Sequence, residues 1–150
     1  MAATSRDVEH LKLVALDPDD LAILSAHLQD AIVRPRDLAY LPSSFRFAMV
    51  ARRFDWACAE GEPRRQLTGL HFERVTRCRT RGIDRGRPDT PLALLAVTFE
   101  TRDAPSGIAT LCFAGGASIE LELECIEAQL KDLGPVWSAA SRPAHQVESA

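Results

Sequence analysis

The sequence lacks the long apolar segments that mark a membrane protein. No apolar run approaches the roughly 20 residues that a membrane helix needs, and the opening residues, MAATSRDVEH, do not resemble a secretory signal. The 150 residues are 46% hydrophobic and 26% charged, which is typical of a soluble folded protein. We therefore expect a cytoplasmic protein with one globular domain over 11–138 and flexible tails over 1–10 and 139–150.

Cysteine is scarce, and its positions match neither a metal-binding nor a redox motif. The four cysteines are Cys58, Cys78, Cys112 and Cys125. We expect free thiols that behave as small buried hydrophobic groups. The closest acidic cluster is Asp17, Asp19 and Asp20, which is better explained as the start of a helix than as a metal site. The sequence thus predicts no metal and no cofactor.

Sequence motifs of common catalytic sites are also missing. There is no GxSxG segment and no phosphate-binding P-loop. His71 and Glu73 stand two residues apart in a predicted strand, so their side chains point to the same face and could form a hydrogen-bonded acid–base pair. We interpret them as a half-exposed strand face, and keep an enzyme that uses this pair as an alternative.

The clearest structural pattern lies in residues 107–134. Two alternating, strand-like segments flank Gly115 and Gly116, which tolerate the positive φ angles of a two-residue hairpin turn. This turn would place Cys112 opposite Ile119 on an apolar face.

After this hairpin the spacing of apolar residues changes from two to about 3.6. Ile126, Leu130 and Leu133 fall on one helical face, and Gly134 follows as a stop signal. The pattern predicts a C-terminal helix near 125–133.

An N-terminal helix is predicted near 18–30, because Asp17 can cap it and Pro18 suits its first position. The remaining segments give about seven mostly antiparallel strands, hence an α+β protein. This order of elements fits a pleckstrin-homology-like roll, an analogy that carries no function. A plain antiparallel sheet with both helices on one face is the alternative.

A row of arginines is the one polar pattern beyond the ordinary. Arg77, Arg79 and Arg81 alternate along a predicted strand, which places their guanidinium groups on one face. Guanidinium groups bind carboxylates and phosphates bidentately, so the row is a candidate binding surface. The candidate binding residues are Arg74, Arg77, Arg79, Arg81, Arg85 and Arg87.

An acidic row on another predicted strand offers these arginines a partner. Glu120, Glu122 and Glu124 could pair with them within one molecule or between two subunits. We favour a non-enzymatic cytosolic module that binds a protein partner, or a second copy of itself, through the arginine-rich strand. Binding of nucleic acid or another anionic ligand is the alternative, although the net charge of −3 argues against it.

Several short segments also carry a resemblance to one family. They are AHLQDAI (Ala26–Ile32), LAYLP (Leu38–Pro42), RFDW (Arg53–Trp56), CIEAQLKDLGPVW (Cys125–Trp137) and SRPAH (Ser141–His145). Together they resemble the uncharacterised alphaproteobacterial family of domain-of-unknown-function number 2948, over residues 11–145. The resemblance implies a bacterial cytosolic origin and supplies no activity, cofactor or catalytic residue.

Overall fold

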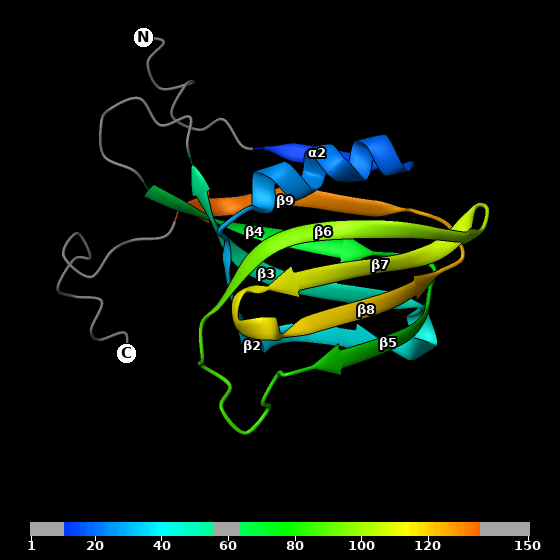
Figure 1. Ribbon diagram of the computed structural model, residues 1–150. Helices are drawn as coiled ribbons and strands as arrows, with labels where there is room; N and C mark the ends of the chain where they lie inside the picture. Colours follow the sequence, from blue (N-terminus) through cyan, green and yellow to red (C-terminus); the bar gives the residue numbers. More distant parts are fainter. Residues whose placement is uncertain (1–10, 56–63, 136–150) are drawn as a thin grey trace, which may run out of the picture.

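The computed structural model describes residues 11–55 and 64–135, which form one nine-stranded antiparallel sheet and one α-helix (Figure 1). The elements in chain order are β1 (Lys12–Ala15), α2 (Pro18–Leu28), β2 (Ile32–Leu41), η1 (Pro42–Ser44), β3 (Arg46–Asp55), β4 (Arg64–Phe72), β5 (Val75–Arg81), β6 (Leu92–Asp103), β7 (Ser106–Phe113), η2 (Ala114–Gly116), β8 (Ser118–Leu123) and β9 (Ala128–Pro135). The α+β class predicted from the sequence is confirmed.

The strands follow the order β1-β9-β4-β3-β2-β6-β7-β8-β5 across the sheet. We call β1, β9, β4, β3 and β2 the larger half, and β6, β7, β8 and β5 the smaller half. The two halves are joined where Ile32 and Val33 of β2 pair with Ala93 and Leu92 of β6. The sheet bends at this junction, so that the smaller half lies in front of the larger half (Figure 1).

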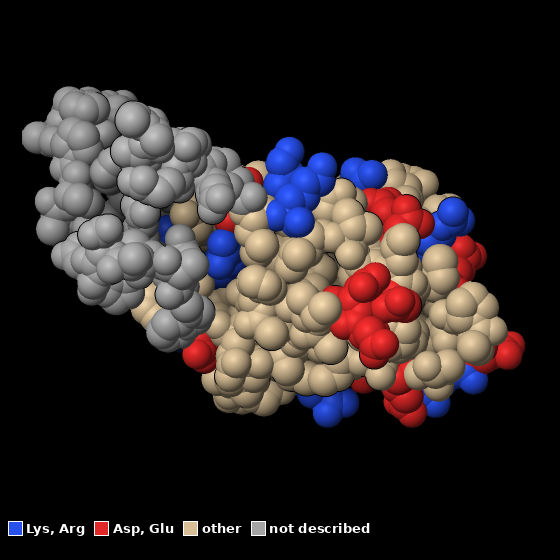
Figure 2. All heavy atoms as spheres, turned by 90° about the horizontal axis from the view of Figure 1, so that it is seen from above, with Lys and Arg blue, Asp and Glu red and all other residues tan. Residues whose placement is uncertain are grey.

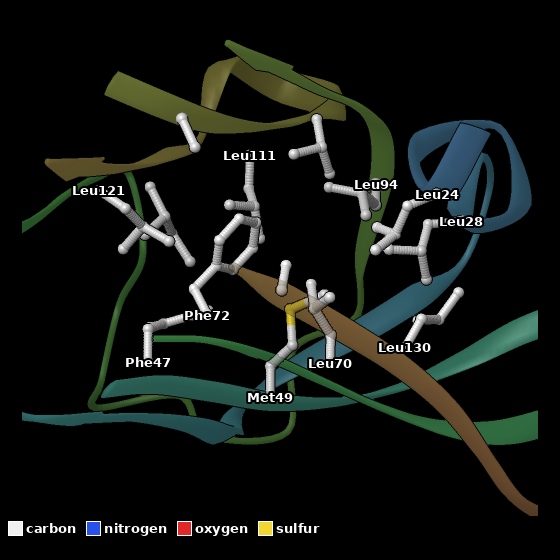
Figure 3. Close-up of a cluster of buried hydrophobic side chains, with 14 of the residues drawn as sticks. Leu24, Leu28, Phe47, Met49, Leu70, Phe72, Leu94, Leu111, Leu121 and Leu130 are labelled. Carbon is white, nitrogen blue, oxygen red and sulfur yellow. The ribbon is translucent and has the colours of Figure 1, made fainter. Parts of the chain in front are cut away.

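The core fills the space between the two halves (Figure 3). Alternate residues of the strands point inward, as the period of two in a pleated strand requires. Among the buried side chains are Phe47, Met49, Leu70 and Phe72 from β3 and β4, and Leu111 and Leu121 from β7 and β8. These two sets point toward one another in Figure 3, and they bind the two layers together by apolar burial.

Helix α2 closes one side of this two-layered structure, where it contacts β1 and β6 (Figure 1). Its start matches the predicted capping, because the backbone N–H of Asp20 donates to Oδ1 of Asp17 over 2.8 Å. Ser25 ties the helix to the sheet, since its Oγ accepts a hydrogen bond of 2.8 Å from the N–H of Val97. The predicted N-terminal helix is therefore present, ending at Leu28.

The predicted C-terminal helix near 125–133 is wrong. Residues 128–135 form β9, which lies between β1 and β4 and pairs with both. The described residues form nine strands instead of about seven, because β9 replaces the helix and residues 64–81 contain two strands, β4 and β5. The pleckstrin-homology-like roll is not matched either, because α2 precedes most of the strands and the last described element is a strand.

The hairpin between β7 and β8 is present, but its predicted register is wrong by one position. The N–H of Phe113 donates to the carbonyl of Ala117 over 2.9 Å, so η2 forms a loop of three residues instead of two. Cys112 therefore lies opposite Ser118 on the outer face and does not point into the core. A shift of one residue exchanges the faces of a strand, which is why the inward residues of β7 differ from those predicted.

Candidate binding surface on strand β5

Strand β5 is the last strand at one edge of the sheet. Its first residue, Val75, is buried, and the N–H of Val75 donates to the carbonyl of Phe45 over 2.9 Å. Beyond this anchor, Arg77, Arg79 and Arg81 are all exposed, and they lie on the outer face of the smaller half. The sequence correctly placed these three guanidinium groups on one face.

The neighbouring strand β8 brings acidic side chains next to this row. Arg77 lies opposite Glu122, and Arg79 lies opposite Glu120. Nη2 of Arg79 is 3.3 Å from Oε1 of Glu120 and 3.9 Å from Oε2 of Glu122. The pairing of the two rows within one molecule, predicted as one alternative, is therefore observed for Arg79, whose side chain remains 52% exposed.

Two other predicted binding residues also have carboxylate partners. Nε of Arg74 is 3.2 Å from Oε1 of Glu127, next to the turn that connects β4 and β5. Nε of Arg87 is 4.0 Å from Oδ2 of Asp84 within the loop that follows β5. These arginines are less available than Arg77 for binding another molecule.

Three predicted binding residues, Arg77, Arg81 and Arg85, have no carboxylate within ion-pair distance in the part of the chain that the structure describes. Arg85 lies near the partly buried thiol of Cys78. Burial raises the pKa of this thiol, and the positive charge of Arg85 partly opposes that rise. Within the described residues, the six candidate arginines thus separate into three that have a carboxylate partner and three that have none.

The loop between β5 and β6, residues 82–91, is fastened to β2. The N–H of Arg36 donates to the carbonyl of Pro88 over 3.0 Å, and Nη2 of Arg36 donates to Oδ2 of Asp89 over 3.0 Å. The side-chain hydrogen bond from Arg36 lowers the pKa of the Asp89 carboxyl below its ordinary value. These contacts hold the loop that carries Arg85 and Arg87 beside the sheet.

His71 and Glu73 do form a pair, since Nδ1 of His71 is 2.7 Å from Oε2 of Glu73. The same carboxylate oxygen accepts a hydrogen bond of 2.9 Å from Nε of Arg46. The three side chains lie on the outer face of the larger half, where His71 is opposite Ala48 and Gln129. The carboxylate of Glu73 is thus shared between His71 and Arg46, an arrangement that is also expected for a half-exposed strand face.

A polar cluster on the inner face of the larger half was not predicted from the sequence. Four polar residues are buried there, because their positions in the strands point inward: Arg53, Gln66, Thr68 and Asp132. The carboxylate of Asp132 accepts hydrogen bonds from Nε and Nη2 of Arg53, from Oγ1 of Thr68 and from the N–H of Leu11. Its acceptors are thus occupied by the protein itself, and the cluster is structural.

Two further classes of site find no support in residues 11–55 and 64–135. No group of three or more His, Cys, Asp or Glu side chains in these residues is placed to hold a metal ion. No helix among them is long and apolar enough to cross a lipid bilayer.

Comparison with known proteins identifies a family. No curated protein and no solved structure gives a match to this chain. The model of the family described as "Protein of unknown function (DUF2948)" matches residues 11–145, in agreement with the resemblance found in the sequence. The chain belongs to this family.

Proposed function

We propose that this protein is an interaction module that binds an acidic segment of another protein through the arginines of β5. The observation that carries the proposal is the contrast along the row. Arg79 in the middle binds carboxylates, whereas Arg77 and Arg81 on either side of it are exposed and unpaired within the described residues. Three like charges at a spacing of two repel one another, and added carboxylates would relieve that repulsion.

The surroundings of the row favour a protein over a nucleic acid. Glu120 and Glu122 lie next to the arginines on the same face, and Glu124 and Glu127 lie near Arg74. These carboxylates would repel the continuous phosphate charge of a nucleic acid, whereas single carboxylates of a partner can be placed between them. The face that carries α2 does not supply an alternative, because its basic atoms occur in small, separate groups on a largely uncharged surface (Figure 2).

The proposal is tested by removing the charges of Arg77 and Arg81. The variant R77Q/R81Q keeps the ion pairs of Arg79, and K12Q/K131Q is its matched control, because Lys12 and Lys131 are exposed neighbours on β1 and β9. Both variants lower the net charge by the same amount. Each protein is used to capture material from its own cells, with and without nuclease.

A protein that is captured by the wild type and by K12Q/K131Q, survives nuclease and is lost with R77Q/R81Q supports the proposal. Its binding should weaken as salt is added, because the contacts are exposed ion pairs. Captured material that disappears on nuclease treatment would instead indicate a nucleic-acid binder. Equal capture by all three proteins would show that the arginine row is only a solvated face.

A further inference from the structure

We infer that the partner segment binds as an additional strand along the free edge of β5, with an acidic residue at every second position. This inference rests on the proposed function and adds the form of the ligand to it. An extended peptide that joins an open sheet edge obtains affinity from backbone hydrogen bonds and specificity from alternate side chains.

The edge of β5 is open over most of its length. β5 is the terminal strand, and β8 is its only strand neighbour in the described residues. On the other side, the N–H of Val75 is bonded to Phe45, and no strand among residues 11–55 and 64–135 pairs with the segment from Thr76 to Arg81 there. Six residues of strand extend over about 20 Å, which is enough backbone to align a short peptide.

Strand β8 shows which side chains this row accepts. Its sequence SIELEL alternates between buried apolar residues and outward polar residues. The outward positions Glu122 and Glu120 lie opposite Arg77 and Arg79, and both carboxylates lie within 4.0 Å of Arg79. Ser118, which carries no charge, lies opposite Arg81. A strand on the opposite edge would meet the same outward row, so acidic residues at alternate positions would fit it in the same manner.

In the bound segment, the side chains between its acidic positions would point to the inner side of the β5 edge. There Cys78 is partly buried against the core, and so is Ile83, just beyond the end of β5. Thr80 lies between them on the same side and is exposed. Apolar, β-branched residues of the partner would cover this side and would also favour the extended conformation. The ligand class is therefore an extended segment in which acidic and apolar residues alternate.

A second copy of β5 is a poor occupant of this edge. Two β5 strands that pair with their outer faces on the same side would bring arginine opposite arginine, because the row repeats at every second residue. Like charges directly opposite destabilise a strand pair. The row thus protects the edge against self-association, a known role of charges on edge strands, and leaves it open to an acidic strand.

Four synthetic peptides test the inference by isothermal titration calorimetry at neutral pH. The first is acetyl-Glu-Val-Glu-Val-Glu-Val-Glu-amide. The second has the same composition with all four Glu residues first and the three Val residues last. The third is the alternating peptide N-methylated at each Val. The fourth is the alternating peptide N-methylated at each Glu, which blocks the backbone amides that the third peptide leaves free. We expect the alternating peptide to bind the wild type and K12Q/K131Q equally, and R77Q/R81Q about tenfold or more weakly.

The inference further requires that the block peptide and one of the two N-methylated peptides bind at least about tenfold more weakly than the alternating peptide. Hydrogen exchange of amides in β5 should slow when the alternating peptide is bound. If the block and both N-methylated peptides bind as well as the alternating one, yet all lose affinity for R77Q/R81Q, strand addition is wrong and the proposed function remains. If no peptide distinguishes R77Q/R81Q from K12Q/K131Q, or none binds, both are overturned.

Discussion

Arg53 and Asp132 form a buried bidentate ion pair between β3 and β9, with Nε 2.9 Å from Oδ1 and Nη2 2.7 Å from Oδ2. The side chains are only 10% and 1% exposed. Thr68 and the backbone of Leu11 complete the hydrogen bonding of the carboxylate. The pair therefore connects four segments of the larger half: the start of β1 and the strands β3, β4 and β9.

Removal of one partner should destabilise the fold strongly. Both Asp132→Asn and Arg53→Met leave a buried group without its counterpart, and such changes cost about 3–5 kcal/mol. Urea denaturation of each variant measures this loss as a drop in the free energy of unfolding. Arg102→Gln is the control, because Arg102 and Glu100 form an exposed pair whose removal should cost about 0.5 kcal/mol or less. If Asp132→Asn lowers the free energy of unfolding as little as Arg102→Gln does, the structural role of the pair is contradicted.

The same carboxylate should make stability depend on pH in the acid range. Burial opposes its ionisation, but the hydrogen bonds from Arg53, from the N–H of Leu11 and from Thr68 outweigh burial and lower the pKa of Asp132 in the folded state. A lowered pKa stabilises the folded protein at pH values above the ordinary pKa of about 3.9, and this contribution is lost as the pH falls through the lowered value.

The difference in unfolding free energy between the wild type and Asp132→Asn should therefore be constant from about pH 6 to pH 5 and shrink as the pH falls below about 4. Urea titrations at a series of pH values measure it. A difference that stays constant down to about pH 2 would show that the carboxylate has the same pKa in the folded and unfolded states.

This ion pair also explains why a helix was predicted where the structure has β9. Ala128, Leu130 and Asp132 point inward in β9, while Leu133 is 55% exposed on the outer side. An inward charge and an outward leucine break the alternation expected for a strand and leave an apolar spacing that resembles a helix. Arg53, which makes an inward Asp132 possible, lies 79 residues earlier, so no local pattern could reveal the pair.

Other parts of the fold were predictable to the extent that their signals are local. The capping by Asp17, the arginines at every second position of β5 and the alternating polar and apolar residues of β8 are local signals, within a few residues of the structure they determine. The presence of the hairpin could be predicted from Gly115 and Gly116, but its register could not. A three-residue loop uses the same two glycines as a two-residue turn, and packing of the inward residues decides between them.

Gly107 should be intolerant of any side chain. A Cβ atom at this position of β7 would overlap the carbonyl oxygen of Glu100 and the ring of Phe99, and backbone oxygen cannot move without disturbing the pairing of β6 with β7. We expect Gly107→Ala to lower the free energy of unfolding by about 3 kcal/mol, as overpacking does. Thermal and urea denaturation measure the change.

Gly69→Ala is the matched control in β4. Its Cβ would lie 3.6 Å from Cδ1 of Leu133, an ordinary contact, and Gly69 has no positive φ. This change should stabilise the protein by about 0.4–1 kcal/mol, because alanine restricts the unfolded chain. If Gly107→Ala and Gly69→Ala change the free energy of unfolding equally, the close approach at Gly107 does not determine the effect of its substitution.

Arg77 and Arg81 should be dispensable for folding, in contrast to Arg53. Their side chains are exposed and have no carboxylate partner in the described residues, so their replacement breaks no ion pair there. Removing both charges also reduces the repulsion on Arg79 between them. The free energy of unfolding of R77Q/R81Q should therefore lie within about 0.5 kcal/mol of the wild type, as surface substitutions usually do.

This measurement decides how the binding experiments are to be understood. If R77Q/R81Q is as stable as the wild type in urea and still loses the acidic partner, the two arginines serve recognition and not the fold. A loss of stability above about 2 kcal/mol would place them among the residues that hold β5 to the sheet, and binding through them would then lose its support. The exposure of both guanidinium groups at the open edge favours recognition.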